Sequence, residues 1–289
     1  MTAPLNAPLL DGAVAEALRR AGDPATAPGR RRYPGHLRDT WPVHRRQSAQ
    51  LVAGWLALTV AWIGLGKLLT GPLADSLIVH SDQRLANWVV AHRTPTWNHL
   101  TVWGSFLAET ITKVTVTAIV ALVFLMLWRR WFEPVVLVLS LAIEASAFIA
   151  VTTVVGRDRP DVPRLDGSPV GSSFPSGHTA AAAAYIAIAI VVFWHTRRRS
   201  ARVVMVMVTA LIPVVVAASR IYRGMHFLSD TVAGAVLGGG AVLLTVVVLR
   251  RSPEGVQISG SSHEPARLMA DPGRSSTEPV PSHDGAPIG

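Results

Sequence analysis

The stretch SSFPSGHTAAAAAYIAIAI, residues 172–190, changes character part-way along its length. It opens with serine, proline and glycine, which are typical of turns and helix starts, and continues as an apolar run. The run predicts a membrane helix with His178 in its first turn. Taken alone, this histidine is more readily explained as a capping or solvated residue than as a reactive one.

Apolar runs of this kind recur along the chain. Half of its 289 residues are hydrophobic and only 16% are charged, whereas soluble domains carry about 25% charged residues. Several of the runs approach the ~20 residues needed to cross a bilayer. The fold class that we predict is therefore all-α and integral to the membrane, a six-transmembrane-helix bundle. Its expected spans are residues 49–70, 112–128, 134–155, 179–195, 203–219 and 227–249.

The basic residues predict how these spans are oriented. The net charge of +9 comes almost entirely from arginine, because Lys67 and Lys113 are the only lysines. Arginine clusters follow the second, fourth and sixth spans, a pattern typical of topology signals rather than of a nucleic-acid surface. Positive charge is favoured on the cytoplasmic side. We therefore expect a multi-pass protein of the plasma membrane with both termini cytoplasmic, no nucleic-acid partner, and a lysine in the first span that must snorkel or pair.

Three regions divide the chain. Residues 1–47 predict a disordered basic tail, residues 48–251 a membrane domain, and residues 252–289 a second disordered tail. The chain has no cysteine, which excludes disulfides, thiolate catalysis and cysteine-ligated metals. The outer segment 71–111 has apolar residues at helical spacing, so it predicts one or two amphipathic helices at the interface. Packing against the bundle and capture of lipid explain them equally well.

Two other predicted outer segments bring reactive side chains to the face that carries His178. In ASRIYRGMHFLSDTVAG, residues 218–234, His226 and Asp230 are four positions apart and share one helical face. An aspartate so placed can accept the Nδ1 proton of the imidazole and leave Nε2 as a nucleophile. The pair alone is equally explained by an ordinary hydrogen bond at a helix start.

Arginines on the same face predict an anion site. Arg159, in VVGRDRPDVPRLDG (residues 154–167), and Arg220 present planar forks that suit phosphoryl oxygens. Ser176 and the free amides around Gly177, at a helix N-terminus, add further donors. Two imidazoles, two guanidiniums and these donors on one membrane face together indicate phosphoryl transfer.

Three motifs carry a family resemblance. The sequences RP (159–160), PSGH (175–178) and SRIYRGMHFLSD (219–230) resemble the signature motifs of the type 2 phosphatidic acid phosphatase (PAP2) superfamily, which also includes vanadate-dependent haloperoxidases. The resemblance covers roughly residues 50–250. One position departs from it, because Thr152 stands where the first motif of the family usually has a lysine. Arg157 is near enough in sequence to supply the missing charge.

The resemblance implies a metal-independent lipid-phosphate phosphohydrolase that uses no cofactor. It implies that His226 forms a phosphohistidine, that Asp230 orients it, and that His178 protonates the leaving oxygen. It also implies a phosphate-binding set, with Arg157 as a helper: Arg159, Ser176, Gly177, Arg220 and Arg157.

The expected partners are the lipid bilayer and a membrane lipid phosphate, bound at a site that faces the extracytoplasmic side. Isoprenyl pyrophosphate (such as undecaprenyl pyrophosphate), phosphatidic acid and phosphatidylglycerophosphate remain open as substrates, and the sequence leaves the oligomeric state open. One alternative is a catalytically weak lipid-phosphate binding or transport protein of the same fold. The other is a haloperoxidase that uses the pocket for vanadate, against which the six spans argue.

Overall fold

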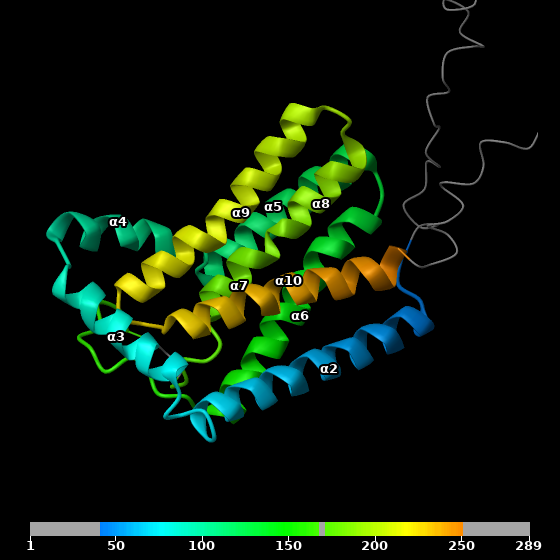
Figure 1. Ribbon diagram of the computed structural model, residues 1–289. Coiled ribbons are helices and arrows are strands. Elements are labelled where there is room, and N and C mark those ends of the chain that lie inside the picture. The colour runs from blue at the N-terminus through cyan, green and yellow to red at the C-terminus, as the bar shows by residue number, and fades with distance from the viewer. Residues whose placement is uncertain (1–40, 168–170, 251–289) are drawn as a thin grey trace, which may run out of the picture. The chain divides into compact units, whose positions relative to one another are not determined.

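The computed structural model describes residues 41–167 and 171–250 (Figure 1), and its regular structure there is helical. Six stretches are long and apolar enough to cross a membrane. They are α2 (Arg45–Thr70), α5 (Thr110–Trp128), α6 (Phe132–Val155), the consecutive α7 (Gly177–Ala184) and α8 (Ile186–His195), α9 (Arg199–Tyr222) and α10 (Leu228–Arg250). The predicted all-α, six-span membrane fold is confirmed, and the protein is a multi-pass membrane protein. The predicted disordered tails lie outside the described residues, except that 41–47 lead into and begin α2.

Helices α7 and α10 pack unusually closely. A Cβ atom added to Gly234 would lie 2.3 Å from the carbonyl oxygen of Ser176, and one added to Gly238 would lie 2.0 Å from that of Ala180. Only glycine allows two helix backbones to approach to this distance. The glycine-rich run of α10 thus brings its second and third turns against the first turn of α7.

Two shorter helices, α3 (Leu77–Ala91) and α4 (Pro95–Phe106), occupy the predicted outer segment. Each begins at a capping side chain: Ser76 accepts the amide of Val79, and Thr94 accepts that of Trp97. Both lie at the end of the bundle where α9 leads into α10 (Figure 1), and both contact α9. This end of the bundle carries the candidate site.

Charged side chains inside the bundle are paired. Lys67 of the first span donates from Nζ to the carbonyl oxygen of Val155 at 3.2 Å, at the C-terminus of α6. Lys113 of α5 lies 3.8 Å from the carboxylate of Glu144 in α6, which is fully buried. Pairing, the second of the two outcomes expected for Lys67, is therefore the one observed, and a helix C-terminus suits a cation.

Candidate active site

The start of α7 is tied directly to the start of α10. Ser176 is fully buried, and its Oγ accepts the amide of Thr179 and so caps α7. Its own amide donates to the carbonyl oxygen of Asp230 at 2.9 Å. Gly177 is the first residue of α7, and a Cβ there would lie 2.7 Å from the Phe148 ring. The chain therefore turns into α7 at a position with no room for a side chain.

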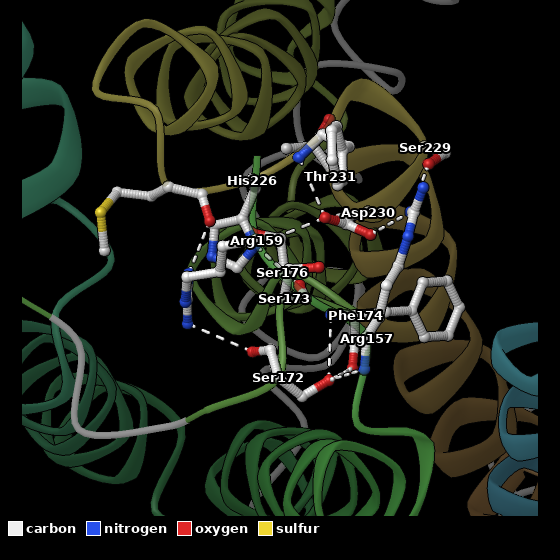
Figure 2. Close-up of polar contacts among 12 residues, drawn as sticks. Arg157, Arg159, Ser172, Ser173, Phe174, Ser176, His226, Ser229, Asp230 and Thr231 are labelled. Carbon is white, nitrogen blue, oxygen red and sulfur yellow. Dashed lines mark hydrogen bonds and ion pairs between the residues drawn. The ribbon is translucent and has the colours of Figure 1, made fainter. Parts of the chain in front are cut away.

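His226 lies in the short connection between α9 and α10, and only 4% of it is exposed. Its Nδ1 is 2.7 Å from the carbonyl oxygen of Ser173 and 3.9 Å from Oδ2 of Asp230 (Figure 2). The spacing predicted that the aspartate accepts the Nδ1 proton, whereas the atom at hydrogen-bond distance is a backbone oxygen. A proton donated from Nδ1 to that carbonyl leaves the lone pair on Nε2.

Asp230 is the third residue of α10 and is fully buried. Its Oδ2 accepts the amide of Phe227, just before the helix, at 2.9 Å. This is the carboxylate half of a capping box. Its Oδ1 accepts Nη1 of Arg157 at 2.6 Å. In Figure 2 the carboxylate lies between His226 and Arg157, so one helix-capping group contacts both.

Burial holds the pKa of His226 well below its usual range. The positive charges of Arg220 and Arg159 lower the pKa further, and His178 adds to this, while the hydrogen bond to Ser173 opposes it. The imidazole is therefore neutral at physiological pH and needs no base to make its lone pair available.

Two arginines flank this imidazole. Arg159 donates from Nη1 to the carbonyl oxygen of Met225 at 2.5 Å and from Nη2 to that of Ser172 at 3.2 Å, so both arms are anchored on backbone. Burial lowers its pKa, which makes an anion a favourable neighbour. Arg220 donates from Nη1 to Oδ2 of Asp166 at 3.1 Å.

Asp166 also binds Arg223, whose Nε donates to it at 2.5 Å. Its side chain is 25% exposed. Burial would raise the pKa of this carboxyl, but the hydrogen bond and charge of Arg223, with the charges of Arg220 and His178, outweigh burial and lower it. The carboxylate of Asp166 thus binds Arg220, an arginine that the sequence assigned to phosphate.

The structure gathers the predicted residues at the first turns of α7 and α10. His178 is the second residue of α7, is partly buried, and interacts electrostatically with Arg220, Arg159 and Asp166. Arg157 lies in the same region, but its guanidinium is directed at Asp230 and Asp82. Thr152 is buried in α6, and its hydroxyl has no hydrogen-bond partner among the described residues. Within residues 41–167 and 171–250, no cluster of three histidines or carboxylates is placed to hold a metal.

Three contacts were missed by sequence reasoning. The contact of Ser173 with His226 is made by a backbone carbonyl, which any residue type could supply, so the sequence does not indicate it. Asp166 was not among the predicted site residues. Asp82 did leave a signal, because it lies three positions before Leu85 and so interrupts the apolar stripe of its helix with a carboxylate.

Residues 133–254 match the PAP2 superfamily. Among solved structures, a transmembrane PAP2-type phosphatidylglycerolphosphate phosphatase from Bacillus subtilis is 21% identical, covers 75% of this chain and 99% of its own, and superposes with a TM-score of 0.57. Aquifex aeolicus LpxE is 24% identical over 57% of this chain and 93% of its own, with a TM-score of 0.44. No curated protein matches this chain in sequence. The first of these structures shares the fold of the six spans.

Proposed function

We propose that this protein is a PAP2-type membrane phosphatase that hydrolyses lipid phosphate or pyrophosphate monoesters through a phosphohistidine on His226. The observation that carries the proposal is the state of that imidazole. It is buried and neutral, and its Nδ1 lies 2.7 Å from the Ser173 carbonyl. A neutral histidine with a fixed tautomer, beside arginines, is suited to attack phosphorus.

In the first step, Nε2 of His226 attacks phosphorus in line, and the P–O bond to the lipid breaks as the N–P bond forms. His178 donates its proton to the departing lipid oxygen. In the second step, His178 removes a proton from water, which attacks phosphorus and releases inorganic phosphate and free His226. The negative carboxylate of Asp230, 3.9 Å from Nδ1, stabilises the positive charge that the imidazole carries in the intermediate.

The phosphoryl oxygens are bound by Arg159 and Arg220, together with the amide of Gly177 at the start of α7. The amides in the first turn of a helix have no acceptor within that helix and are oriented toward an anion. The Ser176 hydroxyl contributes through the cap that it forms for this turn, where its Oγ lies 3.0 Å from the Thr179 hydroxyl. Arg157 is proposed to help through Asp230, which it contacts.

The site lies at one end of the transmembrane helices, which we assign to the extracytoplasmic side on the basis of the arginine clusters. A site at that depth suits a headgroup held at the lipid–water boundary. The candidates are isoprenyl pyrophosphate, phosphatidic acid and phosphatidylglycerophosphate. The Bacillus subtilis protein of similar fold is named as a phosphatase of the last of these lipids.

The decisive experiment measures phosphate release by purified protein in detergent, with EDTA, across these three lipids. We expect release from at least one lipid, persistence with the chelator, and loss in His226→Ala. His99→Ala, which alters an exposed histidine of α4, is the matched control and should retain activity. Undiminished release by His226→Ala would refute the phosphohistidine mechanism.

Thr152 supports the alternative of a weak binding or transport protein. This position carries no charge, and its buried hydroxyl has no partner among the described residues, so one phosphate contact is weaker. A protein of that kind would bind these lipids and release no phosphate in the same assay.

A further inference from the structure

We infer that Asp82, on α3, is a positioning residue for the proposed nucleophile and acts through Arg157 and Asp230. Asp82 is only 5% exposed, although the polar residues around it on α3, Ser81, Arg84 and Asn87, are exposed. Buried carboxylates are costly unless they are paired and hydrogen-bonded. The burial of this one therefore requires partners, and these lead to the site.

The first partner is Arg157, which lies between two carboxylates. Its Nη2 donates to Oδ2 of Asp82 at 3.1 Å and its Nη1 to Oδ1 of Asp230 at 2.6 Å. Its guanidinium carbon is 4.5 Å from the centre of the Phe227 ring, which fixes the plane of the fork. With Arg157 only 5% exposed, little water screens these charges.

The second partner is the first turn of α10. The amide of Ser229 donates to Oδ1 of Asp82 at 3.2 Å, and the Ser229 hydroxyl donates to Oδ2. The same hydroxyl accepts Nη1 of Arg157 at 2.7 Å. Asp82 therefore caps a helix from a different part of the chain, and a carboxylate is favoured at that end of a helix. Ser229 immediately precedes Asp230, so the turn held by Asp82 is the one that carries this aspartate.

These contacts give Asp82 two effects on His226. It holds the turn and the arginine that fix the Asp230 carboxylate 3.9 Å from Nδ1. It also makes the Asp82–Arg157–Asp230 group net negative rather than neutral, which favours the positive phosphohistidine over the neutral imidazole. Both effects act on the reaction after the lipid has bound. The contacts of Asp82 are to Arg157 and Ser229, so Asp82 is not proposed to bind the lipid.

The inference rests on the proposed function and is tested on the full chain with the lipid that the unaltered protein hydrolyses. Asp82→Asn keeps the size of the side chain and removes its charge. Asp75→Asn, at an exposed position just before α3, is the matched control. We expect kcat to fall by about tenfold to a hundredfold in Asp82→Asn, the range typical of partners that orient an active-site group, with KM and the thermal midpoint little changed. The control should match the unaltered protein.

A double-mutant cycle separates positioning from general support of the fold. If Asp82 acts through Asp230, the combined Asp82→Asn and Asp230→Asn variant should lose much less than the product of the two single losses. Ser229→Ala removes the shared hydroxyl while every charge stays, so it tests the same group if Asp82→Asn fails to fold, and its kcat should also fall.

Three outcomes are distinguishable. Absence of phosphate release by the unaltered protein with every lipid refutes the proposed function, and the role of Asp82 with it. Release that is lost in His226→Ala but unchanged in Asp82→Asn, or in Ser229→Ala, overturns the role of Asp82 alone. The role of Asp82 is also overturned if kcat/KM of Asp82→Asn falls because KM rises while kcat is unchanged. It is overturned as well if the losses in the double mutant equal the product of the two single losses.

Discussion

Substitution of Gly238, in the interior of α10, by alanine should lower kcat at the candidate site. The new Cβ would lie 2.0 Å from the carbonyl oxygen of Ala180, about 1.4 Å inside the 3.4 Å at which ordinary contact begins. The obstacle is helix backbone, so the strain can be relieved only if α7 and α10 move apart. Overpacking of this kind costs about 1–3 kcal/mol.

The movement would be transmitted to the proposed general acid. His178 lies two residues before Ala180 on α7, while His226 lies just before α10, so separation of the helices changes the distance between the two imidazoles. A misplacement of about 1 Å costs roughly a hundredfold in rate. We therefore expect kcat for phosphate release from lipid to fall by about that factor, with a lower thermal midpoint in detergent.

Gly239 provides the control, because a Cβ there meets no heavy atom of the described residues within 4 Å. Both glycines lie in the interior of α10 and gain the same helix propensity on substitution, so only the close approach differs. Equal kcat values for Gly238→Ala and Gly239→Ala would show that the contact between α7 and α10 does not set the geometry of the site.

Three further predictions concern charges. Asp166→Asn should lower the inhibition constant of inorganic phosphate by about fivefold, since a partly exposed ion pair contributes up to about 1 kcal/mol; a higher constant would show that the carboxylate supports phosphate binding. Thr152→Lys should raise kcat/KM if one phosphate contact is missing, a deficit of about 2–4 kcal/mol; an unchanged or lower value would show that the site is built around threonine. Because the pKa of His226 is low in the folded protein, only the unfolded chain takes up a proton at this residue just below about pH 6.5. The free energy of unfolding therefore decreases as the pH is lowered below that value. The thermal midpoint should therefore drop less between pH 7 and pH 5 in His226→Gln, and equal drops would contradict this.

The spans were predictable because hydropathy is a local property of the sequence. Their ends were less so. The predicted fifth span stopped at residue 219, where Arg220 interrupts the apolar run, whereas α9 continues to Tyr222. Arg220 is 5% exposed there because a loop carboxylate pairs with it. A charged residue ends an apolar run in the sequence but need not end the helix.

The side chains proposed for the candidate site were chosen from short, local motifs. Their partners were not predictable in this way. The hydrogen-bond partner of His226 Nδ1 is a backbone oxygen 53 residues away, and Asp82 binds Ser229 across 147 residues. Such pairs depend on how the helices pack, which no local pattern encodes. The i,i+4 spacing predicted that His226 and Asp230 share a helical face, but His226 lies in the connection before α10. The two side chains are 3.9 Å apart, and Nδ1 lies at hydrogen-bond distance from the Ser173 carbonyl instead.

Two arginines of the site, Arg157 and Arg220, differ in how firmly their carboxylate partners are held. Arg157 lies between Asp82 and Asp230, both at least 95% buried, so its partners form part of the packed interior. Arg220 is paired with Asp166, whose side chain is 25% exposed and lies on a loop. A doubly charged phosphate competes well with the second carboxylate and poorly with the first. We therefore propose two roles for the same residue type: Arg157 fixes the carboxylate beside the proposed nucleophile, and Arg220 exchanges the loop carboxylate of Asp166 for the phosphate of the substrate.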